Sequence, residues 1–303
     1  MCPRCEVAGT VTGRGGRMPM NYSLDLVAAK LDENMPSLSP TATKVMELAN
    51  DLNCSPSELT KVIKLDPVLS AKVLKLVNSS YFALSNTIVS LEKAIILLGL
   101  NTIRNLALSA AVLSQMERKR LAQAFDGEAF WLHSIGVGAA AKLIARKRGV
   151  EKKRLEDFFI AGLLHDLGLP VEGFMFPEEM KRIVVAAAEV GVMGAEEEVL
   201  NGVGHCVVGK LLADRWRLSL DLAKVMALHH TPWIEGAETE LNLTVYLANV
   251  LCKTIGVGLV LDKRPVDCDP MVFEELGVEP SIGKEIAESL RCEIERAKEF
   301  LSV

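Results

Sequence analysis

The chain has 303 residues, half of them hydrophobic, and a formal net charge of −5 at pH 7. This length suffices for one large domain or two small ones, while the acidic balance excludes a dedicated nucleic-acid binder, which needs a basic surface. The sequence has no uninterrupted run of 18 apolar residues, which is the length that would indicate a membrane span. The chain does not begin with the layout of a signal peptide, so we expect a cytoplasmic protein that contacts neither nucleic acid nor membrane.

Helices are predicted along almost the whole chain. Aromatic residues make up only 5% of the sequence, and the apolar residues are mainly Leu, Ala, Val and Ile, which suits helix packing better than a β-sandwich. One clear helix start is a capping box, in which Ser55 and Glu58 flank Pro56 at the first helical position. The expected helices are 24–31, 41–51, 56–66, 67–77, 90–98, 101–116, 128–148, 154–166, 177–190, 196–201, 203–216, 220–230, 240–255 and 281–301. We therefore predict an all-α fold.

Changes in composition suggest how the chain is divided. A Gly- and Arg-rich stretch lies near the beginning, and charged residues from Glu117 to Arg120 precede a loop at Asp126. The predicted parts are a disordered tail at 1–20, an N-terminal helical half at 21–120, a metal-binding half at 121–235 and C-terminal helices at 236–303 that pack on the bundle.

All of the chain's histidines lie in the second half: His133, His165, His205, His229 and His230. His165 is followed by Asp166 within an apolar run, where a carboxylate is costly to bury unless it is paired or bound to metal. Imidazole and carboxylate are the expected ligands of Fe, Mn, Zn or Ni, and a helical bundle can aim several of them at one interior point. A lone histidine on an apolar helix is more often a hydrogen-bonded core residue, so both roles stay open at this point.

The segment around His165 resembles the signature of the HD phosphohydrolase superfamily, since it reads Ala161-Gly-Leu-Leu-His-Asp-Leu-Gly168. Members of that superfamily bind metal through a first His, the His-Asp doublet and a later Asp. His133 matches the first of these ligands in its sequence context. His205 and the His229-His230 pair match the additional histidines of members that hold two metal ions.

Residues 25–235 resemble the HDOD branch of this superfamily more specifically. The motifs that carry the resemblance are Met35-Pro-Ser-Leu-Ser-Pro40, Asp66-Pro-Val-Leu69, Val77-Asn-Ser-Ser-Tyr-Phe82, Ala94-Ile-Ile-Leu-Leu-Gly99, Gly204-His-Cys-Val-Val-Gly209, Trp216 and His229-His230. The resemblance implies a multi-helix HD-type bundle with an N-terminal helical subdomain. It also implies one or two divalent transition-metal ions, held by His133, His165, Asp166, His205, His229, His230 and Asn249.

Two positions depart from the pattern of catalytic relatives. Asn249 stands where HD enzymes present their last Asp, and Leu169 stands where cyclic-dinucleotide phosphodiesterases carry a Lys that steadies phosphate. Both changes weaken metal-assisted hydrolysis, which needs an anchored metal and a cation on the phosphate. Lys253, one helical turn after Asn249, could replace that cation, although a solvated surface lysine is the simpler interpretation.

Two functions follow from the resemblance. The leading hypothesis is a bacterial signal-transduction output or scaffold module of HDOD type, with a structural metal site, signalling proteins as partners and a nucleotide as an alternative ligand. The rival is a metal-dependent phosphohydrolase or phosphodiesterase that acts on a nucleotide or cyclic dinucleotide, with Asp166 in a catalytic role. The complete set of histidines favours the rival, whereas Asn249 and Leu169 count against it.

Overall fold

The computed structural model describes residues 22–34, 39–51, 53–79, 81–82, 84–117, 126–234, 239–259, 261 and 268–297. These residues form α-helices, one short 3₁₀-helix and connecting turns, and they contain no strand. The all-α prediction is therefore confirmed. The predicted disordered tail at 1–20 lies outside the described residues.

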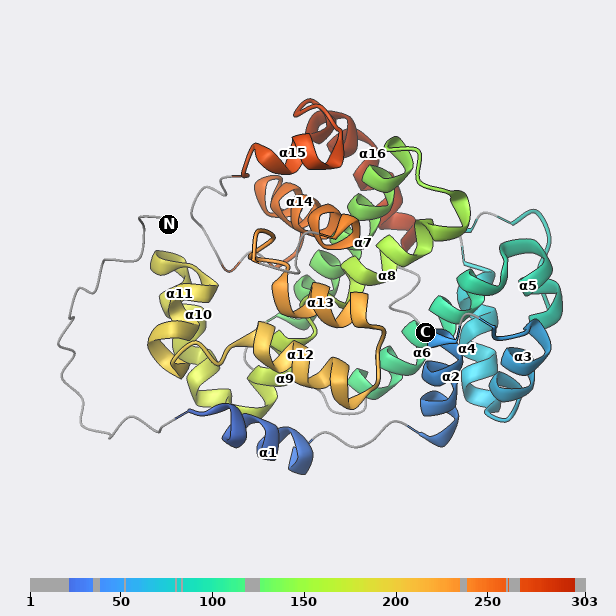
Figure 1. The fold of residues 1–303 in the computed structure, drawn as a ribbon, viewed down its shortest axis with the longest axis horizontal. Helices are drawn as coiled ribbons and strands as arrows, with labels where there is room; N and C mark the ends of the chain where they lie inside the picture. The colour runs from blue at the N-terminus through green and yellow to red at the C-terminus, as the bar shows by residue number, and fades with distance from the viewer. Residues whose placement is uncertain are drawn as a thin grey trace.

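The helices of the N-terminal half occupy one side of the molecule (Figure 1). They are α2 (Pro40–Asn50), α3 (Pro56–Lys64), α4 (Pro67–Val77), α5 (Leu91–Leu98) and α6 (Leu100–Glu117). The first three begin with proline directly after Ser39, Ser55 or Asp66, whose side chains accept hydrogen bonds from the first backbone N–H groups. Helix α6 packs against α2, α4 and α5 and also contacts the second half of the chain.

Helix α1 (Leu24–Asn34) packs against the second half of the chain, although the sequence boundaries place it in the first. Its neighbours are α9 (Gly168–Met175) and α12 (His205–Arg215). The Lys30 ammonium donates to the Met175 carbonyl oxygen at 3.3 Å, and the nearby Tyr22 hydroxyl donates to Glu179 at 2.6 Å.

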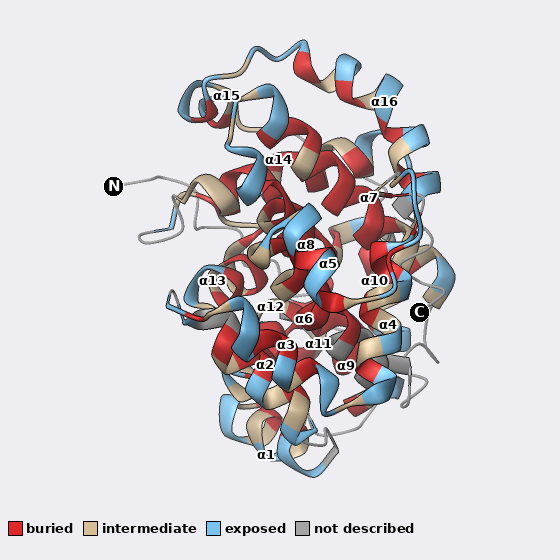
Figure 2. Ribbon diagram, turned by 90° about the vertical axis from the view of Figure 1, so that its right-hand side faces the viewer, coloured by how far each residue is buried: buried red, intermediate tan, exposed pale blue. Residues whose placement is uncertain are grey.

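Three helices form the centre of the molecule: α7 (Gly127–Lys147), α8 (Leu155–Leu164) and α14 (Glu240–Thr254). All residues of α8 except Asp157 are buried, as expected for a helix that is apolar on every side (Figure 2). Helix α16 (Ile282–Ala297) packs on α7, and α15 (Met271–Leu276) packs on α14. The remaining elements are η1 (Lys152–Arg154), α10 (Pro177–Val190), α11 (Val192–Leu200) and α13 (Leu220–Leu228).

The structure corrects the predicted helix boundaries at the His-Asp doublet. The expected helix at 154–166 ends at Leu164, and His165, Asp166 and Leu167 form a buried turn before α9, which the sequence pattern did not separate. Apolar residues continue through this turn, so hydrophobic periodicity gave no sign of the break. Helix α11 begins at Val192 rather than at 196, and α15 was not predicted.

Glycines allow the central helices to approach closely enough to bring their polar residues together. A Cβ atom on Gly162 of α8 would lie 2.6 Å from the Cα of Gly138 in α7. A Cβ on Gly168, at the start of α9, would overlap the backbone carbonyl of His205 in α12. The turn that carries Asp166 is therefore held directly against α12, and any larger residue at these glycines would push the helices apart.

A buried polar network ties the two halves together. The Lys142 ammonium on α7 donates to Oε1 of Glu156 and to the Tyr81 hydroxyl, both at 2.6 Å. The Tyr81 hydroxyl donates in turn to Oε2 of Glu156 at 3.2 Å. Because Tyr81 belongs to the connection between α4 and α5, these bonds fix the first half against the central helices.

One described stretch, Lys152–Met175, is long and apolar enough to cross a membrane by length and composition alone. In its most apolar window 94% of the residues are buried inside the protein. Core helices of folded domains pass the same test, so this stretch is weak evidence for a membrane span.

Candidate metal centre

The side chains predicted as metal ligands come from separate elements of the second half and converge on one interior point. They lie in α7 (His133), the turn after α8 (His165 and Asp166), the start of α12 (His205), the end of α13 (His229 and His230) and α14 (Asn249). All except His230, which is half-buried, are buried. The fold thus brings together every residue of the predicted set.

Asp166 lies at the centre of this group. Its Oδ2 is 3.2 Å from Nε2 of His165 and 3.9 Å from Nε2 of His133. Its Oδ1 is 3.0 Å from Nε2 of His229 and 3.5 Å from Nε2 of His205. Four imidazoles therefore direct the same ring nitrogen toward one carboxylate.

The other nitrogen of each imidazole, Nδ1, faces an oxygen acceptor. These acceptors are the carbonyl of Val257 for His133 (3.1 Å), of Gly162 for His165 (2.7 Å) and of Val225 for His229 (3.0 Å), and the Glu196 carboxylate for His205 (2.6 Å). An oxygen acceptor requires a proton on Nδ1, which leaves the Nε2 atom of a neutral ring with a free lone pair. This is how proteins usually orient histidines that bind metal.

The centre contains more acceptors than donors. Within the described residues, Nε2 of His165, Nε2 of His229 and Oδ1 of Asp166 are buried and make no hydrogen bond. Each buried unsatisfied polar atom costs about 1–3 kcal/mol. A divalent cation would satisfy all of these atoms at once, so the residues present fit a transition-metal site.

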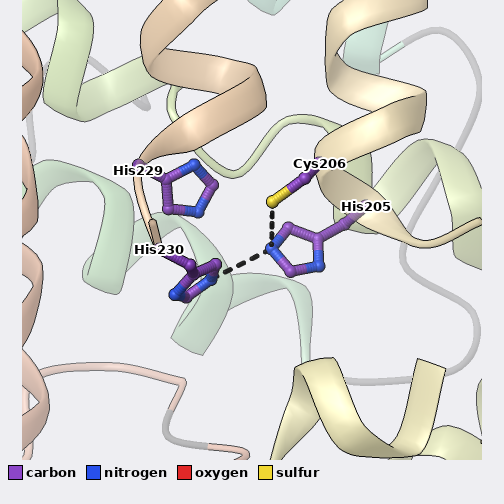
Figure 3. A group of neighbouring side chains, drawn as sticks. All are labelled: His205, Cys206, His229 and His230. Carbon is purple, nitrogen blue, oxygen red and sulfur yellow. Dashed lines mark hydrogen bonds between the residues drawn. The ribbon is translucent and has the colours of Figure 1, made fainter. Parts of the chain in front are cut away.

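Among the described residues, the ligand-type side chains fall into three groups, of which two lie around Asp166 and the third consists of Glu172, Glu196 and His205. Ligand atoms lie within 4.8 Å of one another in His133, His165 and Asp166, and likewise in His205, Cys206, His229 and His230. In the second set (Figure 3), Nε2 of His205 is 3.1 Å from Nε2 of His230 and 3.5 Å from Sγ of Cys206. Two neighbouring sets are compatible with two ions.

Asn249 is buried in α14 and contacts the first set. Its Oδ1 lies 3.1 Å from Nε2 of His133. The amide oxygen can bind a metal but carries no charge, so it compensates a bound cation less than a carboxylate at this position would.

Two buried carboxylates behind His205 were missed by the sequence interpretation. Glu196 of α11 accepts both Nδ1–H of His205 and its backbone N–H, at 2.6 Å and 3.2 Å. Glu172 of α9 is fully buried, and neither of its oxygens makes a hydrogen bond within the described residues. Burial, followed by the charge of Glu196, raises the pKa of Glu172 well above its ordinary value. Burial and the charge of Glu196 thus favour the uncharged form of Glu172, whereas Glu196 holds His205 in place.

The ionisation of the centre suits metal binding. Burial lowers the pKa of His133 and of His229 to about 4, and it lowers the pKa of His230 well below its ordinary value. Burial alone would raise the pKa of Asp166, but contacts with His165 and His229 hold it well below its usual range. At pH 7 the carboxylate is charged and these three imidazoles are neutral, as metal ligands must be. His205 is the exception: burial lowers its pKa, but Cys206 and Glu196 outweigh burial and raise the pKa well above its ordinary value, so His205 must release a proton to bind metal.

A cavity of about 20 Å³ adjoins these side chains and is lined in part by His133, Asp166, Leu169 and Lys253. A water molecule needs roughly 10–15 Å³ by this measure, so the cavity has room for little more than one water. Leu169 lines this cavity with an apolar side chain. Lys253 faces the cavity while remaining half-buried, so it is not the solvated surface lysine that the sequence favoured.

Comparison with known proteins gives a family match over most of the chain. The family described as HDOD domain matches residues 35–232. An uncharacterised protein of Treponema pallidum (strain Nichols) is 26% identical over 228 residues, which are 74% of this chain and 43% of that protein. The chain therefore spans less than half the length of this curated relative.

Solved structures share the fold over nearly the whole chain. An HDOD domain protein of unknown function from Geobacter sulfurreducens superposes with a TM-score of 0.75 at 24% identity, covering 92% of this chain and 98% of that one. A provisionally named phosphohydrolase from Shewanella amazonensis SB2B gives 0.70 at 22% identity, with coverages of 90% and 98%. A provisionally named signal transduction protein from Marinobacter aquaeolei VT8 gives 0.68 at 21% identity, with coverages of 93% and 66%. At these identities the likeness establishes the fold alone.

Proposed function

The chain belongs to the HDOD family, and from this premise we propose that it is a cytoplasmic signal-transduction module with a metal-binding centre and little or no hydrolytic activity. Support comes from the convergence of imidazoles on Asp166 and from the small space beside them. The names of two structural neighbours, one a phosphohydrolase and the other a signal transduction protein, agree with the two activities between which this proposal decides.

We assign the metal ligands to the residues that surround Asp166. His133, His165 and Asp166 would hold one ion, with Asn249 as a neutral oxygen donor, and His205, His229 and His230 would hold a second. A divalent ion here would neutralise the buried carboxylate, connect five separate segments of the chain and lower the pKa of a coordinated water. The protein's own contribution is to fix the imidazoles through their Nδ1 bonds and to exclude bulk water.

The observation that carries the proposal is that the centre has many metal-ligating side chains but a very small cavity. The centre has enough donors for one or two ions, but its cavity of about 20 Å³ is far smaller than a phosphodiester. Leu169, which is 4% exposed, lines that cavity with an apolar side chain where an anionic substrate would need a cation. A structural or regulatory metal fits these constraints better than a catalytic one.

One observation favours the rival function, a metal-dependent phosphohydrolase. Lys253 lines the same cavity as His133 and Asp166, so a positively charged side chain is present beside a phosphate that entered it. In that case Asp166 and the imidazoles would bind the metal and Lys253 would orient the phosphate. The substrate would be a nucleotide or cyclic dinucleotide.

The partners that we infer are signalling proteins that dock on the N-terminal half. Helices α3 to α5 and their connections expose the apolar side chains of Leu65, Val68, Val89, Ile96 and Leu97. The same helices carry the exposed Lys61 and Lys93, while the exposed Lys64 pairs with Glu92, and we infer an amphipathic partner helix with acidic residues for this surface.

Metal content and hydrolysis test the proposal together. Elemental mass spectrometry of the purified protein should find one or two equivalents of Fe, Mn, Zn or Ni, and the double variant His165→Ala, Asp166→Ala should retain none. With Mn²⁺ or Fe²⁺ added, neither bis(p-nitrophenyl) phosphate nor cyclic dinucleotides should be turned over. Absence of metal after incubation with all four ions would overturn the metal assignment. Turnover that the Asp166→Ala variant abolishes would establish the rival function.

A further inference from the structure

A second and much larger cavity lies where the two halves of the protein meet. It is bounded by α6 of the first half and by η1, α8 and the starts of α13 and α14 of the second. Its volume of about 320 Å³ lies within the range of ~300–1,000 Å³ that is usual for small-molecule sites. No residue that lines it also lines the metal-centre cavity. We refer to it as the inter-half cleft.

Two arginines give the cleft donors for an anion. Arg104 of α6 is half-buried, and its Nη1 donates to the neutral amide oxygen of Asn101 at 3.2 Å. Arg154, at the end of η1, donates through Nη2 to Glu240 at 3.2 Å and is otherwise exposed. A guanidinium has five N–H donors in a planar fork, so each arginine retains donors that match a phosphate or carboxylate.

The rest of the cleft is suited to a ligand with both polar edges and an apolar face. Asn105 donates to Oδ1 of Asp157 at 2.6 Å, which leaves the second carboxylate oxygen available to a ligand donor. Ile160 and Leu222 are buried and Leu241 is half-buried, so the cleft also has an apolar wall. Asp221, at the start of α13, is a second carboxylate in the lining, so two arginines, two carboxylates and an apolar surface surround a single space.

We propose that the inter-half cleft binds a mononucleotide, with its phosphate on Arg104 and Arg154, its hydroxyl or amino groups on Asn105 and Asp157, and its base against Ile160, Leu222 and Leu241. The volume lies near the lower end of the small-molecule range, which favours one nucleotide over a dinucleotide. This inference deepens the signalling role proposed above by naming an input ligand. It does not depend on the metal or on hydrolysis.

The position of the cleft gives such a ligand a route to the metal centre. Helix α8 begins beside the cleft, with Asp157 in its first turn, and ends at Leu164, directly before His165 and Asp166. Helix α13 also begins at the cleft, near Leu222, and ends at His229. A nucleotide bound between α6 and these two helices would hold the two halves of the protein together. It would also restrain α8 and α13, which lead to His165, Asp166 and His229.

Isothermal titration calorimetry of AMP and of GMP with the purified full chain tests the proposal. Saturable one-site binding is expected, and Arg104→Ala should weaken it about 10-fold or more, because a charge-assisted hydrogen bond to phosphate is lost. Lys152→Ala is the matched control, since it removes an adjacent exposed cation that does not line the cleft and should change affinity less than about twofold. Ribose 5-phosphate should bind more weakly than AMP because it has no base.

The outcomes separate this inference from the proposed metal centre. No saturable binding of either nucleotide, or equal losses in Arg104→Ala and Lys152→Ala, would overturn it. Circular dichroism and thermal unfolding establish that each variant is folded. The double variant His165→Ala, Asp166→Ala should still bind AMP if it is folded, and binding that requires those side chains would place the ligand at the metal centre instead.

Discussion

The metal centre and the inter-half cleft differ in what they offer a ligand. Around Asp166 the protein concentrates buried imidazoles and carboxylates beside a cavity of about 20 Å³. The cleft has about 320 Å³, but its polar lining consists of two arginines, two asparagines, Ser219 and the two carboxylates Asp157 and Asp221, and none of the five histidines lines it. The groups that could perform hydrolysis are thus separated from the space that could hold a nucleotide.

Under the proposed function, this separation would allow an HDOD protein to serve in signalling without turnover. A catalytic site needs the reacting groups and the substrate in one place, within near-attack distance. Here the two cavities share no lining residue, and α8 and α13 connect them instead. The expected consequence is that variants at one site change its own binding and leave the other site unchanged.

The largest effect is expected at Glu196, which holds His205 through Nδ1. Loss of such an outer hydrogen bond typically lowers metal affinity about 10–100-fold. Glu196→Ala should fall near the upper end of this range, because it loses both the bond and the charge, and Glu196→Gln near the lower end, because the amide oxygen can still accept. Competition with a chelating fluorophore measures the affinity.

Glu178→Gln is the matched control for Glu196→Gln, because Glu178 is exposed on α10 and pairs only with Lys181 among the contacts described. It should leave metal affinity unchanged. AMP affinity should be the same in all three variants. If Glu196→Gln weakened AMP and metal binding equally, the two regions would not be independent.

The sequence predicted the inner residues of the candidate metal centre better than the residues around them. The histidines and Asp166 could be identified because their residue types are rare and their motif order is specific, and the structure brings them together. Glu196 could not, because it begins an acidic run that reads as an exposed helix start. Its location in an element with the apolar residues Val199 and Leu200, shortly before His205, was the available signal.

Features that depend on tertiary packing left no sequence pattern. The turn at His165 is continuous in hydrophobicity with α8, and its position follows from the contact of Gly168 with α12. The inter-half cleft is assembled from residues on α6, η1, α8, α13 and α14, which are far apart in the chain. Lys253 was interpreted as a surface residue because a single lysine on a helix gives no indication of what lies opposite it.

An intermediate effect is expected for Asn249→Asp. This variant tests whether the neutral amide of Asn249 or the small volume of the cavity keeps the centre from hydrolysing a phosphodiester. A carboxylate near His133 adds a negative charge to the first ligand set, and metal affinity should rise about 10-fold, because attraction to the cation exceeds the cost of burying the charge. Hydrolysis of bis(p-nitrophenyl) phosphate should remain absent, because the cavity and Leu169 are unchanged. Turnover in this variant would show that Asn249, and not the lack of space, keeps the natural centre inactive.

The smallest effect is expected for Lys253→Met, which distinguishes the two functions by the sign of the change. Burial is the main cause of the lowered pKa values of His133 and His230, and the positive charge of Lys253 lowers them further. The same charge also opposes the binding of a metal cation. Removing it should strengthen metal binding about 3–5-fold, corresponding to about 1 kcal/mol for a partly exposed charge, and the gain should shrink at high ionic strength. Methionine preserves the aliphatic stem that packs beside the cavity. If the lysine instead orients a phosphate for hydrolysis, the natural protein would turn over a phosphodiester and the Lys253→Met variant would lose that turnover. Catalytic groups and substrate would then share the cavity beside Asp166, and the separation between the candidate metal centre and the inter-half cleft would not hold.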